Sequence, residues 1–175
     1  MYRSAGFTLM ELIVTLALAV IVLTLGIPSF QNIIRNERLA TRTNDFIAAL
    51  QLTRSEAIKR GVRVTLCKSA TGASCANSGG YEQGWIVFVD PNNNAAVDAG
   101  ETIIRVFQAF PTGANATLTG NTPVARHISF VATGKTQLTT GGFQAGTLTL
   151  CQAPKARRIV INSVGRARTE EATCL

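Results

Sequence analysis

The longest apolar stretch of this 175-residue chain lies near its start. Glu11 and Arg35 bracket 23 residues without charge, most of them Leu, Val, Ile or Ala. A helix needs about 20 such residues to cross the hydrocarbon core of a bilayer, where it satisfies its own backbone hydrogen bonds. The pattern therefore predicts a transmembrane helix over residues 7–28.

A second periodic pattern predicts that the helix continues, amphipathic, over residues 29–60. Apolar residues recur there at spacings that keep them on one helical face, and charged residues occupy the other faces. The apolar stripe consists of Leu39, Phe46, Ile47, Leu50, Ala57 and Ile58. Gly61 is expected to end the helix. Pro28 is expected to bend or open it locally, because proline removes a backbone hydrogen bond.

Strand patterns fill the remainder, residues 61–175. Residues 62–67 alternate apolar and polar side chains, which predicts a half-buried strand. The continuous apolar run 85–89 predicts a central strand, with 103–107 as its hairpin partner. Further strands are expected at residues 128–131, 147–151 and 158–161, separated by Gly/Thr/Asn-rich segments. The predicted fold class is α+β, with a long N-terminal helix packed on the mostly antiparallel β-sheet of a head domain.

The residues ahead of the apolar run form a specific motif. Glu11 stands at the mouth of the run, where a carboxylate is costly in hydrocarbon and usually has a partner. A chain cut between Gly6 and Phe7 would supply that partner as the new amino group of a neighbouring subunit. The segment Gly-Phe-Thr-Leu-Met-Glu-Leu, residues 6–12, resembles the prepilin cleavage motif of type IV pilins and type II secretion pseudopilins.

This resemblance implies a processing and assembly route. Residues 1–6 would be a leader removed by a membrane prepilin peptidase, and the new N-terminal Phe7 would be methylated. Glu11 would guide assembly with other pilins into a filament. The protein would sit in the inner membrane as a single-pass subunit and then join a pilus, with its head in the periplasm or extracellular space. The helix end at 52–60 and the hairpin after Trp85 also resemble the GspH/FimT branch of these proteins.

Charge and cysteine content add two expectations. The chain has 17 basic and 10 acidic residues, a net charge of +7 that favours anionic partners such as nucleic acid or lipid head groups. Its four cysteines all follow the apolar run and suggest two disulfides in an exported domain, with three possible pairings. We favour Cys67–Cys75 and Cys151–Cys174, because each pair closes a local loop.

Cofactor, metal and enzyme sites are not expected. A zinc site lacks support because there is no Cys-x-x-Cys pattern and His127 is the single histidine. The Asp/Asn-rich loop from Asp90 to Glu101 offers oxygen ligands for calcium, but Ala95 replaces the glycine of an EF-hand loop, so side-chain turns are the favoured interpretation. The chain lacks a Gly-x-Ser-x-Gly motif and a Gly-rich phosphate loop between a strand and a helix, which argues against an enzyme.

A basic cluster near the C-terminus is the main candidate site. Its residues are Lys155, Arg157, Arg158, Gly165, Arg166 and Arg168, with Glu170 and Glu171 following. Arginines at i and i+2 of a strand point to one face, arginine can hold a phosphate through two hydrogen bonds, and a glycine lets a ligand approach the backbone. The Gly-Arg-x-Arg element resembles the DNA-binding motif of FimT-type minor pilins of natural transformation. The alternative is a solvated basic edge strand that discourages aggregation.

The predicted function is a minor type IV pilin that binds the DNA backbone without sequence preference, for DNA uptake. Four or five phosphate contacts predict a slope of about −4 in log K against log salt. No aromatic residue interleaves the cluster in sequence, so base stacking is not expected, and either single- or double-stranded DNA is allowed. The leading alternative is a GspH-type minor pseudopilin of type II secretion. A membrane-anchored calcium or ligand sensor is a third possibility.

Overall fold

The computed structural model describes residues 6–174, except for the side chains of residues 25–29. Most of the proposed leader 1–6 therefore lies outside the described residues, as does the side chain of Pro28. The chain divides into two compact units, Met1–Arg38 and Leu39–Leu175. Within the described part of the chain, no helix combines the length and the apolar character needed to span a bilayer.

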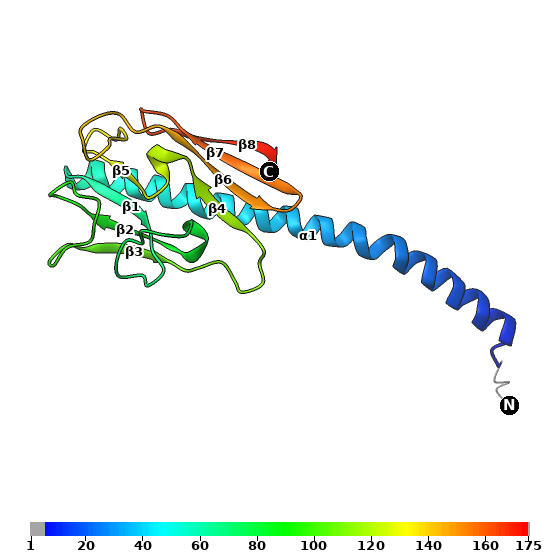
Figure 1. Ribbon diagram of the computed structural model, residues 1–175. Coiled ribbons are helices and arrows are strands. Elements are labelled where there is room, and N and C mark those ends of the chain that lie inside the picture. The colour runs from blue at the N-terminus through cyan, green and yellow to red at the C-terminus, as the bar shows by residue number, and fades with distance from the viewer. Residues whose placement is uncertain (1–5, 175) are drawn as a thin grey trace. The chain divides into compact units, whose positions relative to one another are not determined.

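Helix α1 (Leu9–Arg60) has the bounds that the apolar patterns predict (Figure 1). Its first turn is closed by Thr8 and Glu11. The Glu11 carboxylate accepts hydrogen bonds from the Thr8 backbone N–H at 3.0 Å and the Thr8 hydroxyl at 2.9 Å, while the Glu11 N–H donates to the Thr8 hydroxyl at 3.3 Å. This reciprocal arrangement is a capping box, which satisfies N–H groups that have no partner inside the helix.

The second half of α1 buries one face. The buried positions follow one another at intervals of three and four residues, as a helix packed along one side requires. They include Leu39, Thr43, Phe46, Leu50, Thr53 and Ala57, and Arg42 and Ala49 are buried beside them. Thr43 and Thr53 can be buried because their hydroxyls donate hydrogen bonds to backbone carbonyls one turn earlier in α1, those of Leu39 and Ala49. The prediction for Ile58 is wrong: its side chain is 52% exposed, because it lies one position beyond the buried face.

Gly61 ends α1 as predicted. Its N–H donates to the Ala57 carbonyl at 3.0 Å, and its φ of +68° is a conformation that glycine adopts without a Cβ penalty.

The first sheet has the strand order β3-β2-β1-β5, with every pair antiparallel. The bounds are β1 (Val64–Lys68), β2 (Trp85–Val89), β3 (Ile103–Phe107) and β5 (His127–Phe130). The prediction that β1 is half-buried is wrong, because all five of its residues are buried. Val64 and Leu66 face the main core, while Thr65 and Cys67 on the opposite face are covered by the loops carrying Asp90 and Cys75.

The second sheet has the order β4-β6-β7-β8, again antiparallel. Its strands are β4 (Thr117–Gly120), β6 (Gly146–Gln152), β7 (Lys155–Ile161) and β8 (Ala167–Thr173). Strand β4 was not predicted, and two 3-10 helices, Tyr81–Gln83 and Thr122–Val124, lie in regions where no helical pattern was found. The head therefore contains two four-stranded sheets where one mostly antiparallel sheet was expected.

The main core lies where α1 meets both sheets. Leu148, Leu150, Ile159 and Ile161 of the second sheet join Val64, Leu66, Val87 and Ile128 of the first around the buried face of α1. Phe46 anchors the helix by edge-to-face contacts with Tyr81 and Trp85, each at a centroid distance of 5.2 Å. The α+β class predicted from the sequence is confirmed.

Both expected disulfides are present. Cys67–Cys75 closes a loop of the first sheet, and Cys151–Cys174 joins β6 to the end of β8 across β7. The second bond holds the C-terminal end of β8, which is the edge strand of its sheet.

Candidate nucleic-acid interface

The basic cluster is carried by the hairpin β7–β8. Its seven residue pairs run from Lys155 opposite Thr173 to Ile161 opposite Ala167. A tight turn joins the strands: the Asn162 N–H donates to the Arg166 carbonyl at 3.1 Å, and the Arg166 N–H donates to the Asn162 side-chain oxygen at 2.9 Å. The turn places Arg166 immediately before β8.

Gly165 has a structural reason to be glycine. Its φ is +78°, and a Cβ added there would lie 2.6 Å from the Gly134 carbonyl oxygen and 2.8 Å from Phe130 Cε1. Gly165 is buried, and its carbonyl accepts a hydrogen bond of 3.4 Å from Arg54 Nη1. The space beside the Gly165 backbone is therefore filled by Gly134 and Phe130 of the protein itself. The prediction that Gly165 lets a ligand approach the backbone is not supported by this packing.

The basic side chains do not form one patch. Successive strand residues point to opposite faces, so Lys155 and Arg157 share the face of the core residue Ile159. Arg158 points to the outer face, together with Val160 and, across the ladder, Arg168. The expectation of four or five phosphate contacts on one surface is therefore reduced to three arginines: Arg158, Arg166 and Arg168.

A hollow lies at the turn end of the hairpin. It has a volume of about 410 Å³ and is lined by Val160, Asn162, Arg166, Ala167 and Arg168. Arg166 and Arg168 are both exposed and line the same hollow, as their i and i+2 spacing predicts. No acidic residue lines the hollow among the described residues.

Two carboxylates lie closer to the cluster than the sequence order suggests. Antiparallel pairing sets Glu170 opposite Arg158 and Glu171 opposite Arg157. Glu170 also forms a salt bridge with Arg168, 2.8 Å between Oε1 and Nη2. Arg166 takes part in no salt bridge among the described residues. Which carboxylate meets which arginine depends on the register of the hairpin, which the sequence alone does not define.

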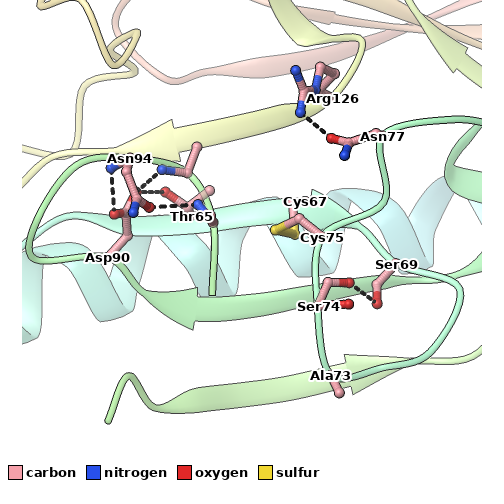
Figure 2. The surroundings of a disulfide bond; sticks show 12 residues. Thr65, Cys67, Ser69, Ala73, Ser74, Cys75, Asn77, Asp90, Asn94 and Arg126 are labelled. Atoms are coloured by element: carbon pink, nitrogen blue, oxygen red, sulfur yellow. Dashed lines mark hydrogen bonds between the residues drawn. A yellow bond between two sulfur atoms is a disulfide. The ribbon is translucent and has the colours of Figure 1, made fainter. Parts of the chain in front are cut away.

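The Asp90–Glu101 loop uses its side chains to make turns (Figure 2). The fully buried Asp90 carboxylate accepts hydrogen bonds from the Thr65 hydroxyl and from the backbone N–H groups of Asn94 and Ala95, at 2.8, 3.1 and 3.2 Å. On the surface, the Asp98 carboxylate accepts from the side-chain amides of Asn92 and Asn94. These hydrogen bonds lower the pKa of Asp98. The contacts agree with the turn interpretation of this loop.

His127 lies apart from any cluster of metal ligands. Burial lowers the pKa of its imidazole, with the positive charge of Arg126 acting in the same direction, and its Nε2 is buried without a hydrogen-bond partner. All four cysteines are in disulfides and offer no thiolate. Among the described residues, no three His, Cys, Asp or Glu side chains could hold a metal ion together.

At the other end of the chain, the residues of the proposed processing site are accessible. Gly6 is exposed and the Phe7 side chain is 75% exposed. The Glu11 carboxylate, assigned to assembly, belongs to the capping box with Thr8.

Comparison with known proteins defines the family. The sequence model of the family described as type II transport protein GspH matches residues 42–165. The chain belongs to the GspH family. In addition, residues 1–27 match the prokaryotic N-terminal methylation motif. The resemblance to type IV pilin-like proteins of the GspH/FimT branch, stated from the sequence, is thereby confirmed.

Two solved structures share the fold of this GspH-family chain. Both are crystal forms of the type IV minor pilin FimU of Pseudomonas aeruginosa, at 19% sequence identity. The first has a TM-score of 0.56 and covers 77% of this chain and 90% of that chain, and the second has a TM-score of 0.54 with 75% and 92% covered. No curated protein matches the sequence. GspH-family proteins are structural subunits of the pilin type, so association with other pilins follows from membership.

Proposed function

We propose that this GspH-family subunit is a minor type IV pilin that binds the DNA backbone through the outer face of β7–β8 and serves DNA uptake in natural transformation. The observation that carries the proposal is the exposed arginine pair, Arg166 and Arg168, lining one hollow without an acidic residue among its described lining. Arg166 and Arg168 would each donate hydrogen bonds to a phosphate at this hollow, and Arg158 would contact a third phosphate.

Recognition of this kind is independent of base sequence. Arginines that neutralise phosphates release condensed counterions, and this electrostatic term supplies most of non-specific DNA affinity. The net charge of +7 favours the approach of a polyanion.

The N-terminal region would deliver the head to the cell surface. In our proposal residues 7–28 anchor the precursor in the inner membrane, prepilin peptidase cuts between Gly6 and Phe7, and Phe7 is methylated. During assembly the Glu11 carboxylate would exchange its Thr8 partner for the amino group of a neighbouring subunit. Mass spectrometry of protein from cells with an active prepilin peptidase would then find methylated Phe7 at the N-terminus, and an intact leader would contradict this route.

A gel-shift assay of the full chain in non-ionic detergent tests DNA binding. The variant Arg166→Gln/Arg168→Gln should lose most binding at moderate salt. A matched control, Arg38→Gln/Arg105→Gln, removes two exposed arginines outside the cluster and the same total charge. Equal affinity of wild type and the cluster variant, or equal losses in both variants, would refute the assigned site.

A second function is favoured by one specific observation, the match to a family described as type II transport protein GspH. A minor pseudopilin of type II secretion would share the anchor and the head but would have no need for phosphate contacts. Deletion of the gene separates the two: loss of transformation with intact protein secretion supports the pilin, and the opposite result supports the pseudopilin.

A further inference from the structure

An apolar groove lies on the turn that precedes the arginine pair. It has a volume of about 470 Å³, and its apolar wall is formed by Val131, Phe143 and Val164. The Phe143 ring is 74% exposed and the Val164 side chain is 44% exposed. An aromatic ring this exposed is in contact with solvent on most of its surface, so it is available to stack with a ligand.

Hydrogen bonds hold the groove in place. The buried Thr136 hydroxyl lies 2.6 Å from the Gln144 carbonyl oxygen and 3.1 Å from the Asn162 carbonyl oxygen. It thereby ties the segment that carries Phe143 to the turn between β7 and β8. An isolated bridge pairs Gln137 with Phe143, which fixes the backbone of the aromatic residue. Figure 1 shows the segment after β5 beside this turn.

The charges around the groove are positive. Lys135 is exposed and lines the groove, and Arg54 reaches the turn through its hydrogen bond to the Gly165 carbonyl. Arg166 lies two residues after Val164 and lines the hollow on the same turn. Neither the groove nor the hollow has an Asp or Glu among its described lining residues. The surroundings therefore match a ligand that combines a negative backbone with flat apolar groups.

We infer that this groove takes a base of single-stranded DNA, stacked on Phe143, while Arg166 and Lys135 hold the flanking phosphates. The inference rests on the proposed function and narrows its ligand. Single-strand binding sites combine a basic track with exposed aromatic rings, and bases in a duplex are already stacked on their neighbours and cannot reach such a ring. This proposal departs from the sequence-based expectation that base stacking plays no part. Phe143 lies outside the basic motif in the sequence, but it lines a groove together with Val164, two residues before Arg166.

The test is fluorescence anisotropy of the full chain in non-ionic detergent with three labelled probes of equal length: oligothymidylate, the same strand with abasic sites, and a duplex. Phe143→Ala should weaken oligothymidylate binding at least about fivefold, the low end of base–aromatic stacking. Its affinity for the duplex and the abasic strand should stay within about twofold of wild type. Phe143→Trp should restore binding, and Phe143→Leu should not, because leucine keeps apolar bulk without a ring.

Control variants separate base stacking on Phe143 from the proposed DNA binding by the arginines. Val106→Ala trims another exposed apolar side chain outside the groove and should change none of the affinities. If Phe143→Ala binds oligothymidylate as tightly as wild type, the stacking site is refuted. The proposed function is still supported in that case if Arg166→Gln/Arg168→Gln weakens binding to all three probes. Equal losses on all probes with Phe143→Ala also overturn the stacking site. A change in self-association with DNA binding intact would assign the groove to a second copy of the chain. Wild type that binds no probe refutes both proposals.

Discussion

Arg168 and Glu170 form a salt bridge on the outer face of β8, with 2.8 Å between Nη2 and Oε1. The two residues are separated by one position and therefore point to the same side of the strand. Their side chains are 72% and 43% exposed, and exposed pairs of this kind contribute about 0–1 kcal/mol. A DNA phosphate therefore competes with a weak internal partner for Arg168.

The variant Glu170→Gln should bind DNA more tightly than wild type. It frees Arg168 and removes one negative charge from the interface, and a pair worth up to about 1 kcal/mol corresponds to a gain of about two- to fivefold. Affinity is measured by anisotropy at low salt. Glu56→Gln is the control, because it breaks another ion pair, Arg60–Glu56 on α1, and removes the same charge. Unchanged affinity of Glu170→Gln would contradict the proposed competition between Glu170 and DNA for Arg168.

Replacement of Gly165 by alanine should destabilise the head. The residue adopts a φ of +78°, and the new Cβ would meet the Gly134 carbonyl oxygen at 2.6 Å. Left-handed backbone and overpacking together cost about 2–5 kcal/mol. Gly113→Ala is a matched control, since Gly113 has the same φ of +78° with nothing within 4 Å. Denaturant unfolding followed by Trp85 fluorescence measures both variants. Equal free energies of unfolding would show that packing does not explain the glycine.

The stability of the head should fall as the pH drops below about 6.5, the ordinary pKa of histidine. Burial lowers the pKa of His127 in the folded protein, aided by Arg126 and Arg63 and opposed by Asp90. Between the folded and unfolded pKa values the unfolded chain binds more protons, so acidification favours unfolding. Denaturant midpoints at pH 7.5 and 5.5 measure the loss. His127→Gln removes the titrating group, and an equal loss in that variant would assign the effect to other residues.

Local patterns were enough to predict the elements whose own sequence carries a clear apolar pattern and a boundary residue. The bounds of α1 follow from its apolar stripe and from Gly61, and β2 and β3 follow from apolar runs between turn residues. The disulfide partners follow from the short loops they close. In each case the determining interactions lie close together in sequence.

Strand β8, its register with β7 and the groove at Phe143 were not predicted, because they depend on contacts between segments that are distant in sequence. Strand β8 reads Ala-Arg-Thr-Glu-Glu-Ala-Thr and lies at a sheet edge, so it has no buried face to impose an apolar alternation. Its pairing with β7 determines which carboxylate meets which arginine, and no single segment encodes that register. The approach of Phe143 to Val164 depends on Thr136, which belongs to a third segment.

The salt dependence of duplex binding tests the central claim most directly. Three phosphate contacts, by Arg158, Arg166 and Arg168, predict a slope of about −3 in log K against log salt, and Arg166→Gln/Arg168→Gln should reduce it to about −1. The measurement is an anisotropy titration of one duplex with both proteins at several salt concentrations. The account is contradicted if the two proteins give the same slope, or if the wild-type affinity does not change with salt.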